Sequence, residues 1–378
     1  GLVGNDQIGG DRRFIYNETV IGGGKYYFGT TPSQYTSVRL GEFPNPNVGW
    51  EKAKKLNLGA DLSFFNQLNI SVDYFKENRE GIFLQRKSIP MYVGLSTKPW
   101  VNIGKMRNSG IDASLEYHQP LGKDLHLTVR GNFTYARNRI MDQDEPDYAY
   151  TYMNRSGQMQ WQKFGLVAVG LFQDQEDIDS WTKQSFGEVK PGDIKYLDLN
   201  GDGIVDSYDT KPIGYSDIPE IVYGFGFSLQ WKAFDLSAFF QGVAHVNFST
   251  LTDQTQAFVG RNLKESSVFA DLYGNTWTPE NPGAKYPRMT TGAVDNNNQL
   301  STFWMADGRY LRLKNLELGY TLPKRIANKI AMQNLRVYLS GVNLFTFSPF
   351  KLWDPDLQTG ATNYPNNRII NLGLTIGF

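Results

Sequence analysis

Residues 125–135 read Leu125-His126-Leu127-Thr128-Val129-Arg130-Gly131-Asn132-Phe133-Thr134-Tyr135, and they show the clearest alternation of apolar and polar residues in the chain. Apolar residues or glycine occupy every second position, and polar residues occupy the positions between them. Successive side chains of a β-strand point to opposite faces of the sheet. The stretch therefore predicts a strand with one apolar face and one polar face.

The same alternation recurs along the whole chain. It is found at residues 56–64, 68–74, 111–117, 223–231, 234–240, 310–320, 335–339 and 370–378. In residues 310–320 the apolar phase slips between Leu313 and Leu316, which predicts a β-bulge. The pattern thus predicts about nine strands of the length that a tilted membrane barrel uses.

Two features favour a transmembrane barrel over a soluble β-sandwich. The apolar faces are rich in aromatic residues, as at Tyr223, Phe225 and Trp231, and such bands are typical of the lipid-facing side of a barrel. Connections between strands also alternate between short and long. In outer-membrane barrels the short turns are periplasmic, which predicts long extracellular loops at about residues 139–218 and 248–307 and a last strand that ends at Phe378 in the periplasm.

An odd number of strands does not close a bacterial barrel, and an open sheet in lipid leaves unpaired backbone groups at both edges. We therefore interpret residues 1–378 as the C-terminal portion of one all-β, antiparallel transmembrane β-barrel domain whose earlier strands lie on another segment. The alternative is that residues 1–50 contain one further strand, near residues 38–40, and that the chain closes a ten-stranded pore.

Composition excludes several classes of function. The 38 Lys and Arg balance the 38 Asp and Glu, so no basic surface for nucleic acid is predicted, and the absence of cysteine removes disulfides and thiolate metal sites. The longest run without polar side chains, residues 165–172, is too short for a spanning helix. No nucleophile motif is present, so no enzyme activity is expected. His118, His126 and His245 have no metal-ligand spacing, and we expect them to be structural or to line the lumen.

One motif points to a metal ion. Residues 198–209 match a twelve-residue calcium loop, which supplies oxygen ligands from fixed positions around a glycine turn. The predicted ligands are Asp198, Asn200, Asp202, the carbonyl of Ile204, Asp206 and Asp209. The expected ion is Ca²⁺, with Mg²⁺ as the alternative, because Asp209 is shorter than the usual glutamate at the last position. Its expected role is to stiffen the long loop.

Aromatic residues are also frequent in the predicted loops. These are Trp161, Trp181, Tyr208, Trp277, Trp304, Trp353 and Tyr364. Aromatic rings stack on sugars and peptides, but they also pack loops together and anchor proteins at membrane interfaces. We expect packing or anchoring for each of them.

Several segments together resemble the SusC/RagA-type TonB-dependent outer-membrane transporters of Bacteroidota. The segments that carry the resemblance are Trp50-Glu51, Met106-Arg107-Asn108-Ser109-Gly110-Ile111-Asp112, Gly192-Asp193-Ile194-Lys195-Tyr196, Asp307-Gly308-Arg309-Tyr310-Leu311-Arg312-Leu313-Lys314-Asn315-Leu316 and Ser340-Gly341-Val342-Asn343-Leu344-Phe345. They spread over about residues 40–378. The resemblance implies a barrel of about 22 strands in the bacterial outer membrane, with a plug that this chain lacks.

The resemblance also implies partners and an activity. The expected partners are the N-terminal barrel and plug portion of the same transporter, a SusD-like surface lipoprotein, the TonB complex, outer-membrane lipid and an oligosaccharide or peptide substrate, without nucleic acid. The expected activity is TonB-energised import. Two alternatives stay open: a passive outer-membrane porin, and a secreted, calcium-stabilised glycan-binding β-domain.

Overall fold

The computed structural model of the chain describes residues 1–5, 12–95, 97–252, 255–256, 269–327, 329, 332–360 and 363–377. The predicted strand end at Phe378 lies outside the described residues, as do parts of the second long loop at 253–254 and 257–268. None of the described helices is long and apolar enough to cross a membrane.

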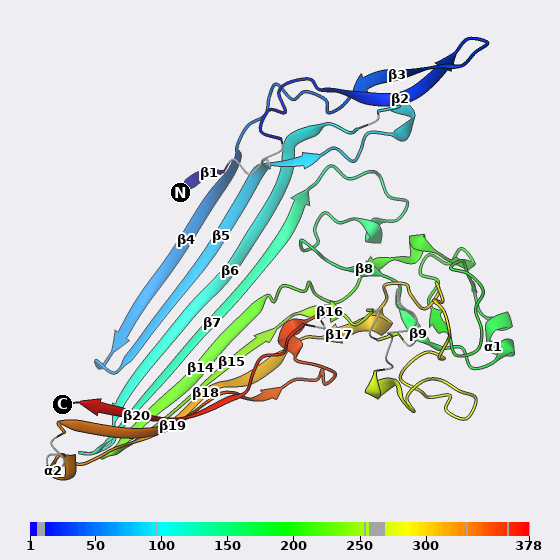
Figure 1. The fold of residues 1–378 in the computed structure, drawn as a ribbon. Helices are drawn as coiled ribbons and strands as arrows, with labels where there is room; N and C mark the ends of the chain where they lie inside the picture. The colour runs from blue at the N-terminus through cyan, green and yellow to red at the C-terminus, as the bar shows by residue number, and fades with distance from the viewer. Residues whose placement is uncertain are drawn as a thin grey trace. The chain divides into compact units, whose positions relative to one another are not determined.

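The main element is a ten-stranded sheet in which strands that follow one another along the sheet are antiparallel wherever their register is given (Figure 1). Its strands, in sheet order, are β1 (Leu2–Asn5), β4 (Glu51–Phe64), β5 (Leu68–Gln85), β6 (Trp100–Pro120), β7 (Leu125–Asp142), β14 (Ile221–Trp231), β15 (Phe234–Ala244), β18 (Tyr310–Thr321), β19 (Asn334–Phe347) and β20 (Ile369–Gly377). All nine predicted strands are therefore present. The additional strand is β1, whereas residues 38–40 belong to β3 (Ser33–Leu40), which pairs with β2 (Val20–Phe28) in a separate sheet.

Several strands are longer than the alternation predicts. The β5 strand continues past Tyr74 into a charged stretch, where Arg79 Nη1 lies 2.8 Å from Glu51 Oε1 and Arg79 Nη2 lies 2.8 Å from Glu77 Oε1. Ion pairs between neighbouring strands replace apolar contacts there. Apolar periodicity therefore marks only part of β5, although the backbone ladder continues.

Register aligns the leucines of six neighbouring strands into one row. Cross-strand pairs join Leu127, Leu229, Leu236, Leu318, Leu339 and Leu372. Leu318 is 51% exposed and Leu372 is 78% exposed, so this row faces outward rather than into a protein core. One position along, the same pairings join Thr128, Ser228, Ser237, Glu317, Ser340 and Asn371 on the opposite face. We call these two sides the apolar face and the polar face.

Aromatic residues flank the leucine row on the apolar face. Toward the short turns, Phe234 lies between Trp231 and Tyr320, with ring centroids 6.3 Å and 4.7 Å away. Toward the opposite ends of the strands, Phe345 and Phe347 are 57% and 61% exposed. An exposed apolar band with aromatic girdles on both sides is the pattern of a membrane barrel and not that of a soluble sandwich.

The predicted bulge in residues 310–320 is confirmed. The register of β18 shifts between Leu313 and Asn315 against both of its neighbours, so that Lys314 has no cross-strand partner. The extra residue accounts for the phase slip, because it restores Leu316 and Leu318 to the apolar face.

Short and long connections alternate along the sheet. In the short turn between β4 and β5, the φ angles of Phe65 and Asn66 are both positive, 52° and 53°. A two-residue hairpin turn whose twist matches that of the strands requires such angles. The short connection after β18 contains α2 (Lys324–Ala327).

The two longest connections contain elements that the sequence pattern does not reveal. Among the described residues they carry α1 (Gln175–Ser180) and four two-stranded sheets. The pairs are β8 (Phe164–Gly165) with β13 (Lys211–Pro212), β9 (Ala168–Leu171) with β11 (Ile194–Tyr196), β10 (Lys183–Gln184) with β12 (Ile204–Val205), and β16 (Asn247–Ser249) with β17 (Met305–Asp307). Short 3-10 turns lie at Met91–Val93, Thr151–Met153, Ser207–Asp209, Ala270–Leu272, Thr302–Trp304 and Pro355–Leu357.

The chain divides into two compact units. The first comprises Gly1–Leu58, Phe75–Gly110 and Arg137–Gln160, and it contains the β2–β3 hairpin. The second comprises Gly59–Tyr74, Ile111–Ala136 and Trp161–Phe378, and it contains the leucine row and the folded loops. The largest apolar core of the described residues lies in these loops and includes Leu166, Ile194, Tyr196, Val205 and Trp304.

Candidate functional site in the folded loops and on the polar face

The segment Gly192–Tyr196, one of those that carry the family resemblance, joins the two longest loops to each other. Asp193 is fully buried and accepts hydrogen bonds from Arg288 Nε at 2.8 Å and from Asn297 Nδ2 at 2.9 Å. The next residue, Ile194, donates its N–H to Asn297 Oδ1 at 2.8 Å. These bonds span about a hundred residues of sequence and fix the second loop against the first.

Three further hydrogen bonds strengthen this junction. Gln184 Nε2 donates to Asn296 Oδ1 at 2.6 Å, and Asn296 Nδ2 donates to the Ile194 carbonyl at 2.8 Å. The Tyr196 hydroxyl donates to the Asn296 carbonyl at 2.8 Å, and burial raises the pKa of that hydroxyl. Because these buried polar groups are hydrogen-bonded to one another, the junction has one defined geometry.

Gly192 is required at this junction for two reasons. Its φ of +89° lies in the left-handed region, which side chains other than glycine rarely adopt. A Cβ atom at this position would also lie 2.4 Å from Trp277 Cε3 and 2.8 Å from Arg288 Cβ. The glycine therefore allows the backbone to approach the second loop closely.

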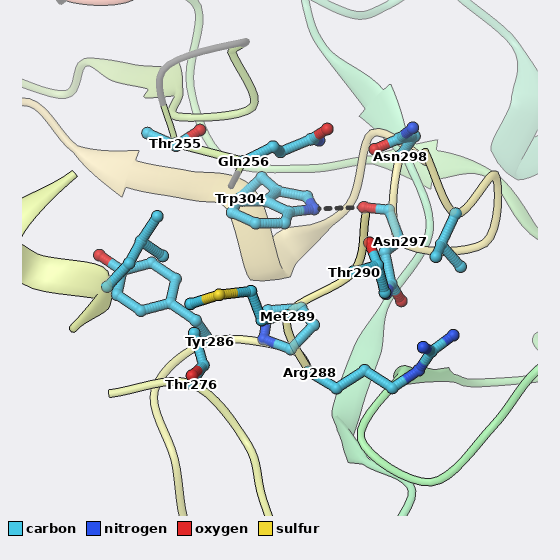
Figure 2. Close-up of a pocket in the computed structure, with 13 residues that line it drawn as sticks. Thr255, Gln256, Thr276, Tyr286, Arg288, Met289, Thr290, Asn297, Asn298 and Trp304 are labelled. Atoms are coloured by element: carbon cyan, nitrogen blue, oxygen red, sulfur yellow. Dashed lines mark hydrogen bonds between the residues drawn. The ribbon is translucent and has the colours of Figure 1, made fainter. Parts of the chain in front are cut away.

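A small cavity lies beside this junction (Figure 2). It is lined by aromatic, amide and hydroxyl side chains, among them Tyr286, Arg288, Asn298 and Trp304, and the indole N–H of Trp304 donates to the Asn297 carbonyl at 2.8 Å. Its volume of about 50 Å³ suits one or a few water molecules and is far below that of a typical ligand pocket. We therefore assign the cavity to loop packing rather than to substrate binding.

The last long connection is held by a second resemblance segment. Arg312 is 2% exposed, forms an ion pair with Asp354, and places Nη1 3.6 Å from Asp356 Oδ2. Tyr310 donates its hydroxyl to Asp356 Oδ1 at 2.9 Å. A hollow of about 300 Å³ lies next to this cluster and is lined by Lys351, Arg368 and other residues of the connection. Its volume is at the lower end of the range for small-molecule sites.

The predicted calcium loop adopts a compact turn. Asp198 accepts the N–H groups of Gly201 at 2.7 Å and Gly203 at 3.0 Å, and both glycines have positive φ. Asn200 accepts the N–H of Asp202 at 2.9 Å. The first half of the loop is therefore wound as the motif predicts, with its oxygens along one turn.

In the second half of the loop the carboxylates bond to backbone N–H groups. Asp209 is fully buried, and its carboxylate accepts the N–H groups of Leu199 at 2.7 Å and Asp206 at 2.8 Å. Asp206 accepts the N–H of Tyr208 at 2.7 Å, and the Ile204 side chain is exposed. Across the described part of the chain, no three His, Cys, Asp or Glu side chains come close enough together to hold a metal ion. Ion binding by this loop stays a prediction.

A carboxylate also closes a loop in the first unit. Asp144 accepts hydrogen bonds from Arg86, from the N–H groups of Lys87 and Ser88, and from the Ser88 hydroxyl at 2.8 Å. Burial alone would raise the pKa of Asp144, but these donors outweigh it and lower the pKa to about 2. The group therefore fixes residues 86–88 while it is ionised.

The polar face carries a second hollow of ligand size. It measures about 420 Å³ and is lined by Asp61, Ser71, Glu116, Arg130 and other residues of β4 to β7. Arg130 Nε donates to Glu116 Oε1 at 2.8 Å, and His118 Nε2 lies 3.2 Å from the same oxygen. His118 and His126 therefore line the polar face, as expected. His245 instead bonds Glu220 at 3.1 Å at the end of β15.

The loop aromatics are mostly used for packing. Trp277 and Trp304 are buried in the apolar core, and Trp181 donates its indole N–H to the Tyr196 carbonyl at 2.9 Å. Trp353 packs against Phe350 with ring centroids 4.6 Å apart. Trp161, Tyr208 and Tyr364 are exposed. The expected packing role is confirmed for the buried rings.

Sequence reasoning missed the residues that hold the loops together, namely Asp193, Arg288, Arg312 and Asp354. The signal that could have found two of them, Asp193 and Arg312, is their position inside the resemblance segments, where a charged residue stands next to apolar residues.

Comparison with known proteins identifies the family. The sequence profile described as TonB dependent receptor-like, beta-barrel, matches residues 16–344. The TonB-dependent receptor P3 of Formosa agariphila is 30% identical over 375 residues, which cover 91% of this chain and 36% of that protein. The TonB-dependent receptor SusC of Bacteroides thetaiotaomicron is 26% identical over 401 residues, which cover 100% of this chain and 37% of that protein.

Solved structures show the same fold. The RagAB peptide importer in the open-open state matches with a TM-score of 0.71 at 21% sequence identity, and the match covers 100% of this chain and 39% of that chain. The closed-closed state of the same importer matches with a TM-score of 0.70 at 22% identity.

The chain spans a little over a third of the length of the curated relatives that it matches. Proteins of this family are transporters and receptors rather than enzymes, and they lie in the bacterial outer membrane. With an exposed apolar band, a polar opposite face and a family profile over most of its length, the chain belongs to the β-barrel family of TonB-dependent receptors and is an outer-membrane protein.

Proposed function

We propose that the protein containing this chain imports oligosaccharides or peptides across the outer membrane, with energy supplied through TonB. The observation that carries the proposal is the match of residues 16–344 to the TonB-dependent receptor barrel, with SusC and the RagAB peptide importer among the similar proteins. A SusD-like surface lipoprotein would close the outer mouth, and the N-terminal barrel and plug portion of the same transporter would complete the pore.

In this proposal the chain has two tasks. The polar face, with its rows of hydroxyl, amide and charged side chains, lines the lumen, and the apolar face contacts outer-membrane lipid. The short turns lie in the periplasm, and the long loops at about residues 139–218 and 248–307 lie outside the cell. The Asp193 junction supports this assignment, because loops that meet a lid and a substrate need a defined shape.

We also propose that residues 198–209 bind Ca²⁺, or Mg²⁺ in its place. The wound first half of the loop supports this, since Asp198, Asn200 and Asp202 already present oxygens along one turn. A cation would draw the Asp202 carboxylate inward from its contact with Asn200 Nδ2, which is 2.9 Å long.

The proposed transport is tested with the protein in its native membrane. Cells that carry the intact transporter are given labelled oligosaccharide or peptide mixtures, and uptake is compared with and without TonB. The expected result is uptake that stops when TonB is removed and a surface lipoprotein that copurifies in detergent. Uptake that continues without TonB, from a barrel that purifies alone, would favour a passive porin.

A further inference from the structure

The hollow beside Arg312, which we call the mouth hollow, lies on the polar face at the end of the sheet opposite the short turns. Arg312 is paired with Gln241 of β15, and strand alternation puts Gln241 on the same face as Ser237. The connection between β19 and β20 is held against this face, because Asp354 forms an ion pair with Arg312. In the proposed orientation of the barrel, this place is the outer mouth of the lumen, where a substrate enters.

Two cations in the lining of the mouth hollow have no acidic partner. Lys351 and Arg368 both line the hollow and are exposed, and neither is paired with a carboxylate among the residues that the structure describes. The guanidinium carbon of Arg368 lies 5.9 Å from the centre of the Phe345 ring. Contact with the face of a ring leaves the guanidinium N–H groups available to an acceptor.

The carboxylates near the hollow are already engaged by other donors. Asp354 binds Arg312 and accepts a hydrogen bond from Asn366 Nδ2 at 3.2 Å. Asp356 accepts the Tyr310 hydroxyl at 2.9 Å and Asn366 Nδ2 at 3.0 Å. When Arg312 is added to the two unpaired cations, the positive charges of this region exceed the negative charges by one. The lining therefore favours an anionic group over a cation.

A buried acceptor in the same lining has no donor. Asn343 lines the mouth hollow, its Oδ1 atom is buried, and no group of the described residues donates to it. The orientation of the amide is fixed, because Asn343 Nδ2 donates to the Asn367 carbonyl at 3.0 Å. Buried acceptors are nearly always hydrogen-bonded in folded proteins. A ligand with a hydroxyl group beside its anionic group supplies the missing donor.

The remaining lining is apolar and held in place. Phe350, Trp353, Pro355 and Pro365 contribute to it, and the Trp353 indole N–H donates to the Gln358 carbonyl at 2.7 Å. Aromatic rings offer an apolar face against which a sugar ring packs. The volume of about 300 Å³ is small for a ligand site and suits one unit of an oligomer rather than a long segment.

We propose that the mouth hollow binds one uronic acid unit of an acidic oligosaccharide on its way into the lumen. Lys351 and Arg368 bind the carboxylate, and a ring hydroxyl donates to Asn343 Oδ1. A uronic acid is favoured over an acidic peptide, because it carries the carboxylate, the hydroxyl donors and an apolar ring face on a single unit. The inference rests on the proposed import function and narrows its substrate class.

The test compares a charged sugar with its neutral form. The intact transporter, with any surface lipoprotein that copurifies, is titrated in detergent by calorimetry with trigalacturonate and with the methyl ester of trigalacturonate. Lys351→Gln and Arg368→Gln each remove one charge at an exposed position, so both variants are expected to fold. Lys183→Gln is the matched control, because Lys183 is an exposed lysine of the first long loop and has no ion-pair partner among the described residues.

The wild type is expected to bind the acid about ten-fold or more tightly than the ester, because a hydrogen bond to a charged group contributes that much. Lys351→Gln and Arg368→Gln should each weaken binding of the acid about ten-fold and leave binding of the ester nearly unchanged, and Lys183→Gln should behave as the wild type.

Equal affinity of the wild type for acid and ester, or no binding of either, would overturn the mouth hollow as a uronate site. An equal loss of affinity in Lys183→Gln would show a general effect of surface charge and would also overturn it. Tighter binding of triglutamate than of trigalacturonate would overturn the choice of a sugar. The titration does not involve TonB, so failure here is distinguishable from failure of the proposed import function.

Discussion

Replacing Asp193 by alanine is predicted to release the second long loop from the first. The substitution removes the acceptor for Arg288 Nε, Asn297 Nδ2 and the Lys190 N–H, which lie 2.8, 2.9 and 2.8 Å away in the native junction. Arg288 then keeps its charge without a partner. The fold of the barrel strands is not expected to change, because none of these groups belongs to the ten-stranded sheet.

The free-energy cost of the substitution depends on how deeply the Asp193–Arg288 ion pair is buried. Removing one partner of a buried ion pair costs about 3–5 kcal/mol in the free energy of local opening. The Arg288 side chain is 24% exposed and can turn toward water, so the lower end, about 3 kcal/mol, applies. At 1.36 kcal/mol for each factor of ten, the open population of the loops should rise about 100-fold.

Limited proteolysis of the intact transporter measures this population when loops reclose faster than they are cut. Glu188→Ala is the matched control, because Glu188 lies in the same loop, is 81% exposed and pairs with Lys190 over 3.7 Å. A surface pair contributes about 0–1 kcal/mol, so the control should speed cleavage by no more than about five-fold. Equal cleavage rates in Asp193→Ala and Glu188→Ala would refute the junction as the element that joins the loops.

Three further predictions concern the face assignment, acid sensitivity and the metal loop. Leu127→Arg on the apolar face should cost about 2–4 kcal/mol and impair barrel assembly, while Thr128→Arg on the polar face should assemble normally, as judged by mobility on unheated gels. Ionised Asp144 stabilises residues 86–88, and this contribution is complete above its ordinary pKa of 3.8. Because the pKa in the folded protein is lowered to about 2, the contribution is lost as the pH falls from 3.8 to 2. Pepsin should therefore cut residues 86–88 faster as the pH falls through this range, and an unchanged cleavage rate would argue against the stabilising role of Asp144. Asp202→Ala should remove protease protection of the first long loop only when calcium is present, and identical protection in both proteins with and without chelator would exclude the ion site.

The strands could be predicted because their alternation is a local property. Residues 125–135 carry the pattern without reference to any partner, and the bulge at Lys314 appears as a phase slip within one strand. The leucine row could not be predicted, because Leu127, Leu229 and Leu318 become neighbours only once the register between strands is known. The far half of β5 was also missed, since ion pairs rather than apolar contacts mark it.

The contacts within the loops could not be predicted either, because they also join residues that are far apart in the sequence. Asp193 and Arg288 are separated by about a hundred residues, and no local sequence pattern around either residue indicates that the two side chains pair. The two-residue strands β8, β10, β12 and β13 are too short for any periodicity to show. For residues 198–209 the sequence predicted the wound turn, but it did not predict that the buried Asp209 would bond to backbone N–H groups of its own loop.

The most direct test of the proposed barrel orientation determines on which side of the membrane each end of the sheet lies. The chain contains no cysteine, so each introduced thiol is the only one within it. Glu188→Cys lies in the long loop and Phe65→Cys lies in a short turn, and both positions are well exposed, at 81% and 93%. With a maleimide that cannot cross the outer membrane, intact cells should label Glu188→Cys, and Phe65→Cys should react only after the outer membrane is opened. Labelling of Phe65→Cys on intact cells, with Glu188→Cys protected, would contradict the barrel orientation on which the proposed function rests.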